Sequence, residues 1–374
     1  MTIRTTHVGS LPRSQRVVDF LFARERGSRF SRREFDLEMS EATSDTVRRQ
    51  VEAGIDVVSD GETSKISYAT YVKDRYTGFG GDAPRTPPHD LALFPSFMKR
   101  LADEGGTPHY ARPCCIGEIK TKDNDALLKD IDNLKMAMKC HGATEGFMNS
   151  ASPGVISLFL PNDYFPSRDE YLDALGEAMR VEYQTIVASG LFLQLDCPDL
   201  GLARHMMFHD KSDDEFVGIA AKNVEVLNRS LTGLDPSRIR VHICWGNYEG
   251  PHVCDISMDK VFSALMSVNA NHVLFESSNP RHAHEWRIFR DRFSEIPGDR
   301  ILIPGVIDST TNFVEHPEVV AQRLERFLEF VPPDRLMAGS DCGFGTFAGF
   351  GAVDPEVTYA KLAALSEGAR QAGS

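Results

Sequence analysis

The sequence lacks the features that would place the protein in a membrane or on nucleic acid. No run of about 18 apolar residues is present to span a bilayer, and residues 1–7 contain no apolar secretion-signal core. Net positive charge is also missing: the value of -13 argues against nucleic acids and anionic membrane surfaces as partners. Cysteine is sparse, with seven residues in a chain of 374. An odd number without a secretion signal predicts reduced thiols in a cytoplasmic protein.

Internal repeats and a glycine-rich phosphate loop after the first strand are absent, whereas strand and helix patterns alternate along the whole chain. We predict strands at residues 5–10, 54–60, 114–119, 147–151, 191–196, 238–244, 272–276, 301–307 and 335–340, and long helices at residues 33–53, 168–189 and 318–330. This alternation predicts an α/β fold, the TIM (β/α)8 barrel, as a single catalytic domain over residues 1–374. The strands are one too many, so we assign 114–119 to an inserted loop or hairpin segment around residues 78–120. A doubly wound open sheet is the alternative, but it usually carries the missing phosphate loop.

The clearest chemical pattern is His242-Ile243-Cys244 at the end of a predicted strand. Alternate residues of a strand point to the same face, so the imidazole and the thiol are presented together. Alone, such a pair is more often a buried His and a buried Cys that are satisfied by core packing. In a barrel, however, the carboxyl ends of all strands meet at one mouth, where Glu276 and Cys342 also follow strands. Two thiolates, an imidazole and a carboxylate form a tetrahedral zinc set.

Other polar side chains follow predicted strands and are expected at the same mouth: Ser10, Glu62, Asp196 and Asp308. The segment after the Asp196 strand contains His205 and His209, which could supply a cation or a proton donor, or could lie on a helix with a basic face. The remaining cysteines are expected mainly in the core or in loops, and His252, His282 and His284 at the surface or behind the site.

In this order, the strand ends resemble the C-terminal catalytic barrel of the cobalamin-independent methionine synthase family. The resemblance rests on residues 5–12, 57–62 and 193–196, and on His242, Cys244, Glu276 and Cys342, which match the zinc ligands of the family one by one. It implies that Glu62 and Asp196 hold the amino group of homocysteine and that Ser10 holds its carboxylate end.

The chain also departs from that family, and it lacks the N-terminal barrel of the full synthases. Where the family has a Ser-Arg pair before an Arg-Pro motif, Pro108 and His109 precede Arg112. Residues 152–162 contain no Trp to stack on a pterin, and Thr310 stands where the family has a His thought to help protonation. These differences argue against a polyglutamyl folate donor, or for one bound differently.

We therefore predict zinc-dependent transfer of a methyl or alkyl group to a thiol, with a homocysteine-type acceptor. Zn²⁺ deprotonates a bound thiol, and the thiolate is the nucleophile. The candidates for protonating the leaving group are His205, His209 and Asp308. The expected partners are a small-molecule thiol and an alkyl donor; a homo-oligomer is compatible with the sequence, which does not set the oligomeric state.

Two alternatives stay open at this point. Some single-barrel relatives are epoxyalkane:coenzyme M transferases, which open an epoxide with a thiol. The sulfonate of coenzyme M would need a cation such as Arg13 or Arg204. The other alternative, of a different class, is a non-catalytic zinc-bearing barrel that binds or stores a ligand.

Overall fold

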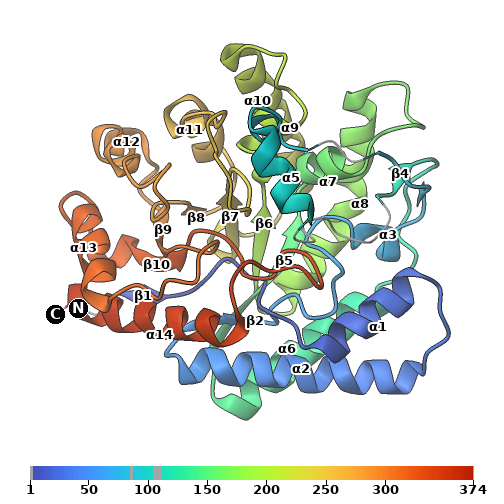
Figure 1. Cartoon of the computed structure of the whole chain (residues 1–374), viewed down its shortest axis with the longest axis horizontal. Helices are drawn as coiled ribbons and strands as arrows, with labels where there is room; N and C mark the ends of the chain where they lie inside the picture. Colours follow the sequence, from blue (N-terminus) through green and yellow to red (C-terminus); the bar gives the residue numbers. More distant parts are fainter. Residues whose placement is uncertain (1–2, 85–86, 104–111, 374) are drawn as a thin grey trace.

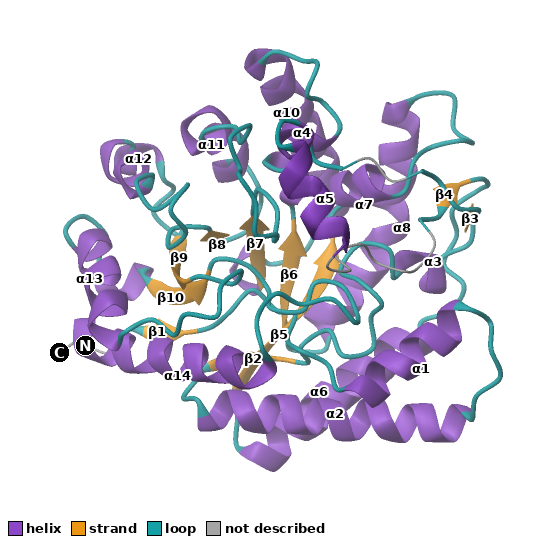
Figure 2. Cartoon of the chain, in the orientation of Figure 1, coloured by secondary structure: helices purple, strands orange, loops and turns teal. Residues whose placement is uncertain are grey.

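The computed structural model describes residues 3–84, 87–103 and 112–373. Its centre is an eight-stranded parallel sheet curled into a barrel, with the strand order β1-β10-β9-β8-β7-β6-β5-β2 (Figures 1 and 2). The strands are β1 (Arg4–Thr5), β2 (Val57–Ser59), β5 (Glu145–Ala151), β6 (Phe192–Asp196), β7 (Ile239–Ile243), β8 (His272–Phe275), β9 (Ile301–Ile307) and β10 (Met337–Ser340). The predicted TIM barrel is confirmed.

Helices surround the strands, as Figure 2 shows in purple around orange. The longer ones are α1 (Gln15–Glu25), α2 (Arg32–Glu52), α6 (Asp125–His141), α8 (Arg168–Ala188), α10 (Asp213–Ser230), α11 (Met258–Met266), α13 (Pro317–Leu328) and α14 (Pro355–Ala372). The short helices are α3 (Val72–Arg75), α7 (Pro153–Phe159), α9 (Ala203–Met206), α12 (Trp286–Asp291), η1 (Pro198–Leu200), η2 (Pro236–Arg238), η3 (Phe293–Glu295) and η4 (Pro333–Arg335). Several begin at a serine whose hydroxyl accepts a free backbone N–H, as Ser31 does for α2, Ser167 for α8 and Ser212 for α10.

Two apolar layers stabilise this arrangement. The larger lies between the strands and the helices. The smaller takes one buried residue from each of seven segments, among them Phe147, Leu274 and Ile303. Strand residues are therefore buried on both faces, which explains why the central strands read as nearly continuous apolar runs.

The barrel closes between β1 and β2 through side chains. Thr5 Oγ1 donates to the Gly54 carbonyl at 3.1 Å, and Thr6 Oγ1 donates to the Val57 carbonyl at 3.1 Å. Strand β1 is shorter than the predicted 5–10, because Val8 N–H donates to the Ser340 hydroxyl and Gly9 has a φ of +142°. From residue 7 onward the chain therefore leaves the ladder.

Gln50 of α2 bridges the junction between the β1 and β2 segments, called the seam below. Its Oε1 lies 2.7 Å from His7 Nε2 and accepts the Ser59 N–H at 2.9 Å, while its Nε2 donates to the Ser59 and Thr46 carbonyls at 2.8 and 3.0 Å. One fully buried amide thus joins the segment after β1, strand β2 and helix α2.

The predicted insertion is confirmed between β2 and α6. Strands β3 (Phe79–Gly80) and β4 (Cys114–Cys115) form a separate antiparallel pair outside the barrel sheet. Between them lie α4 (His89–Ala92), which contacts α9, and α5 (Pro95–Asp103). Pro108 and His109 lie outside the described residues.

Among the described helices, none combines the length and the apolar character that a membrane crossing requires.

Replacing Gln50 with Ala should remove the four hydrogen bonds at the seam and leave buried polar atoms of His7 and Ser59 unpaired. We expect the free energy of unfolding to fall by about 2–4 kcal/mol, measured by urea denaturation. The matched control is Gln15→Ala, which loses one exposed contact to Asp19 and should change stability by less than about 0.5 kcal/mol. Equal effects of both substitutions would contradict a structural role for the seam.

Candidate active site

Three soft metal-ligating side chains converge at the carboxyl ends of β7 and β10. A ring nitrogen of His242 and the Sγ atoms of Cys244 and Cys342 all lie within 4.8 Å of one another, and all three residues are buried. Cys342 reaches this point after a register shift between Gly339 and Ser340, where β10 departs from regular pairing with β9. Such irregularities re-aim side chains next to active sites.

The surroundings of His242 fit a metal ligand. Both of its ring nitrogens are buried and neither has a hydrogen-bond partner, which is costly for an imidazole in a protein interior. Burial lowers the pKa of His242 and so favours the neutral ring, the form that binds metals. Two cysteines and a histidine are a donor set typical of zinc.

The interaction between the two thiols shifts their pKa values in opposite directions. The pKa of Cys244 is lowered because its sulfur accepts a hydrogen bond from Cys342. The same contact, together with burial, raises the pKa of Cys342 well above its ordinary value. One thiolate is therefore formed readily, and a bound cation would favour loss of the second proton.

Glu276, the fourth predicted ligand, follows β8 beside this cluster but is not a member of the three-residue group. Its Oε1 accepts the Trp245 N–H at 2.9 Å, and its Oε2 accepts from Asn279 Nδ2 at 2.5 Å. Burial raises the pKa of Glu276 to about 8. The structure thus brings three of the four predicted ligands together and holds the fourth alongside through two donors.

Asp341, directly before Cys342, ties the β10 loop to the β8 loop. Its Oδ1 accepts the N–H groups of Ser277 and Ser278 at 2.8 and 2.9 Å. Its Oδ2 accepts from the Ser278 hydroxyl at 2.7 Å and from Asn279 N at 2.8 Å. The positions of Glu276 and Cys342 are consequently fixed by the same carboxylate.

The residues predicted to bind the thiol substrate also reach this mouth. Asp196 is the direct neighbour of His242 in the β6–β7 register. Its carboxylate accepts from Asn149 Nδ2 at 2.9 Å. Ser10 lies against the residue after Cys342, where a Cβ on Gly343 would come within 2.0 Å of the serine hydroxyl.

Glu62 completes a buried acidic pair with Asp196. Burial raises the pKa of Glu62 to about 7, with Asp196 adding to the effect and Lys65 opposing it. The pKa of Asp196 is also raised by burial. One Glu62 oxygen has no hydrogen-bond partner, and its backbone φ is +56°. A cation entering between these carboxylates would offset both costs.

The three predicted proton donors lie in different surroundings. The Asp308 carboxylate accepts four hydrogen bonds from the N–H and hydroxyl groups of Thr310 and Thr311, which fold the loop after β9. His209 is exposed and stacks on His89 with ring centroids 4.6 Å apart. His205 is buried in α9, with Nδ1 3.4 Å from Asp255 Oδ1.

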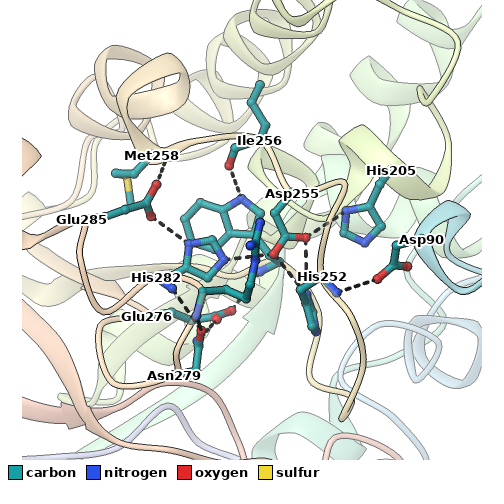
Figure 3. Close-up of polar contacts among 12 residues, drawn as sticks. Asp90, His205, His252, Asp255, Ile256, Met258, Glu276, Asn279, His282 and Glu285 are labelled. Carbon is teal, nitrogen blue, oxygen red and sulfur yellow. Dashed lines mark hydrogen bonds and ion pairs between the residues drawn. The ribbon is translucent and has the colours of Figure 1, made fainter. Parts of the chain in front are cut away.

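A buried network around Asp255 was not foreseen from the sequence (Figure 3). Asp255 Oδ2 lies 3.1 Å from His252 Nδ1 and 3.1 Å from His282 Nε2. The other nitrogen of His282 is 2.7 Å from Glu285 Oε2, and its ring stacks on Trp245 with centroids 4.0 Å apart. His252 is half-buried and His282 buried, whereas His284 is exposed.

The signal that could have revealed this network is the spacing of His252 and Asp255 in the loop that follows the ligand-bearing strand. Their contact depends on the turn of that loop, in which His252 has a φ of +49°. Side-chain pattern rules for helices and strands do not describe such a turn.

The protonation of His282 should make its contribution to stability depend on pH. Burial opposes its charge, yet Asp255 and Glu285 raise its pKa to about 10. Because the folded value exceeds the unfolded one of about 6.5, this stabilisation is complete below pH 6.5 and is lost as pH rises toward 10. In the metal-free protein, the Tm difference between wild type and His282→Gln should be largest at pH 6 and nearly vanish by pH 10. A difference that does not vary with pH would contradict the ion pairing.

Comparison with known proteins agrees with this architecture. The family model described as "Cobalamin-independent synthase, Catalytic domain" matches residues 3–81 and 160–364, and so leaves most of the insertion unmatched. A methionine synthase of Saccharolobus solfataricus is 22% identical over 377 residues, covering 98% of this chain and 93% of that protein. One from Sulfolobus acidocaldarius is 24% identical over 343 residues, covering 91% and 85%.

Among solved structures, a B12-independent methionine synthase from Shewanella sp. W3-18-1, in complex with selenomethionine, superposes with a TM-score of 0.73. It is 21% identical in sequence, and the match covers 99% of this chain and 97% of that one. The family model spans well over half of the chain and includes the strand ends that carry His242, Cys244 and Cys342. The chain therefore belongs to the cobalamin-independent synthase family, within its catalytic domain.

Proposed function

We propose that the protein is a zinc-dependent enzyme that transfers a methyl or other alkyl group to the sulfur of a homocysteine-type thiol, with residues 1–374 acting as one catalytic unit. The observation that carries this proposal is the buried His242, Cys244 and Cys342 cluster beside the acidic pair of Glu62 and Asp196. The names of the curated relatives, which are methionine synthases of similar length, support the same reaction class.

Zinc is the proposed metal because the donor set is soft and one buried imidazole is otherwise unpartnered. When bound, Zn²⁺ would supply a site at which a thiol loses its proton near neutral pH. His242, Cys244 and Cys342 would hold it. Glu276 follows β8 next to this set and would join or leave it, while Trp245 and Asn279 hold its carboxylate through hydrogen bonds.

The acidic pair favours an acceptor that carries an ammonium group. Two neighbouring carboxylates with raised pKa values are stabilised by an added positive charge. An amino group between Glu62 and Asp196 would also give the unpartnered Glu62 oxygen a donor. Ser10, at the Cys342 loop, is placed to meet the carboxylate end of the same amino acid.

The arginines considered for the sulfonate of coenzyme M are engaged elsewhere. Arg13 donates from Nε and Nη2 to the Glu62 carbonyl at 3.2 and 2.7 Å, and from Nη1 to the Gly345 carbonyl. Arg204 binds Asp213 at 3.1 Å and the Phe208 carbonyl at 3.0 Å. These contacts favour the homocysteine-type acceptor over the epoxide-opening alternative.

The alkyl donor stays unassigned. The Thr310 hydroxyl donates a hydrogen bond to Asp308, and a threonine cannot replace the acidic imidazole expected at this position. Residues 152–162 contain no Trp, so a stacking surface for a pterin is missing there. We propose a small-molecule donor other than a polyglutamyl folate. A cytoplasmic location is proposed as well, supported by the seven cysteines, all of them free thiols.

Metal analysis tests the proposed centre. We expect about one zinc per chain in the purified protein, lost in Cys342→Ala and retained in the control Cys254→Ala, since Cys254 lies outside the cluster. Zinc-free wild-type protein that is otherwise folded would contradict the proposal.

Acceptor binding is tested on the cobalt-substituted protein, from the spectral shift and the proton release on adding thiols. We expect a response to homocysteine that weakens roughly tenfold in Asp196→Asn, which removes one charge of the acidic pair. A response to coenzyme M alone would favour epoxide opening. A metal-replete protein that responds to neither thiol would favour a non-catalytic barrel.

A further inference from the structure

Alkyl transfer to a thiol leaves a proton to be delivered. When the leaving atom is nitrogen or oxygen, it departs with an electron pair and must be protonated. Of the donors expected from the sequence, Asp308 is occupied by Thr310 and Thr311, and His209 is exposed. On the premise that the proposed function is correct, the remaining candidates for the acid are the histidines around Asp255, His205 among them.

The ring of His252 faces an acceptor at each nitrogen. Nδ1 lies 3.1 Å from Asp255 Oδ2, and Nε2 lies 3.1 Å from the Tyr248 backbone carbonyl. A carbonyl oxygen only accepts, and an ionised carboxylate only accepts. Both nitrogens can bond only if each carries a proton, so the hydrogen bonds define an imidazolium.

The neighbours of His252 support that state. The two histidines bonded to Asp255 lower the pKa of that carboxylate, which keeps it ionised. Burial opposes the charge of His252, yet Asp255 and, more weakly, Glu276 raise its pKa. His205 meets the ring edge-on at 6.4 Å, and its own pKa is lowered by burial, so it adds no fixed positive charge.

The position of His252 is imposed by the chain around it. Asp90, from the insertion, accepts the His252 backbone N–H at 2.9 Å and the Tyr248 hydroxyl at 2.8 Å. The Tyr248 ring stacks on the imidazole with centroids 4.3 Å apart. Among the described residues, only Glu62 and His252 have a positive φ without being glycine. Such conformations persist where the surroundings fix them, often at functional sites.

The ring also acts on the proposed metal centre. The charge of His252 contributes to lowering the pKa of Cys244, and Glu276 contributes to raising that of His252, so the imidazolium is within electrostatic reach of both. Among the residues that the structure describes, only His242, Cys244 and Cys342 lie close enough together to hold a metal ion, so the network is not a second metal site.

We propose that His252 is the proton donor to the leaving group, with Asp255 as the residue that positions and charges it. The thiolate sulfur forms the new S–C bond, and the bond from carbon to the leaving atom breaks with its electron pair on that atom. The leaving atom accepts the proton on His252 Nε2, which is hydrogen-bonded to the Tyr248 carbonyl before the reaction. The ring keeps its Nδ1 proton toward Asp255, and the proton released by the substrate thiol restores the imidazolium.

Nitrogen NMR on the zinc-loaded protein tests the charge state directly. At pH 7, His252 should show protons on both ring nitrogens, assigned by their loss in His252→Gln. In Asp255→Asn, the Nδ1 partner loses its charge, and His252 should titrate at lower pH. A neutral His252 at pH 7 in the wild type would overturn the proposal.

Two small electrophiles test the proton transfer itself. Iodomethane releases iodide, which needs no proton, whereas epoxypropane releases an alkoxide that does. With homocysteine as acceptor, the S-methyl and S-hydroxypropyl products are counted by mass spectrometry. In His252→Gln, the ratio of epoxide rate to iodomethane rate should fall roughly tenfold or more. The control His284→Gln changes an exposed imidazole and should leave the ratio unchanged.

The pH profile adds a second readout. In the wild type, the epoxide rate should decline relative to the iodomethane rate as His252 loses its proton, and His252→Gln should lack that decline. An equal fall of both rates in His252→Gln would overturn the role of His252 while leaving the alkyl-transfer function intact. If neither electrophile alkylates homocysteine faster than buffer does, the proposed function fails, and this inference fails with it.

Discussion

The hydrogen bonds that Asp341 accepts are the interaction on which the arrangement of the proposed metal centre depends. This buried carboxylate precedes Cys342 and binds three successive residues after Glu276. Gly305 of β9 leaves the space for it, since a Cβ there would lie 2.1 Å from Asp341 Oδ1. The loops after β8 and β10, far apart in the sequence, are therefore joined by direct hydrogen bonds to the Asp341 carboxylate. Side chains held on such a rigid scaffold need little rearrangement to bind a cation.

Charge is distributed in opposite ways on the two sides of that centre. On one side, Glu62 and Asp196 form an acidic pair whose negative charge Lys65 offsets only in part. A cationic ligand would offset the rest. On the other side, Asp255 lies between His252 and His282 and raises the pKa of both. This difference fits the roles proposed above, a cationic substrate on the first side and a proton donor on the second.

The sequence was sufficient to predict the barrel, from strand periodicity, and the convergence of His242, Cys244 and Cys342, from their places at strand ends. His242 lies near the end of β7 and Cys244 directly follows that strand, and a parallel barrel brings every strand end to the same rim. The orientation of Glu276 could not be read this way, since it depends on Trp245 and Asn279. Nor could the difference between His205 and His209, because burial there is decided by the packing of α9 and α4.

The contact between Asp90 and the loop after β7 couples the insertion to the barrel. Asp90 belongs to a stretch that the family model leaves unmatched, yet it binds both Tyr248 and His252 within the matched region. A change that shortened or replaced the insertion would therefore remove the hydrogen bonds that Asp90 accepts from residues 248 and 252. Because these contacts link the insertion to the 248–252 turn, we expect positions 90, 248 and 252 to vary together among related chains.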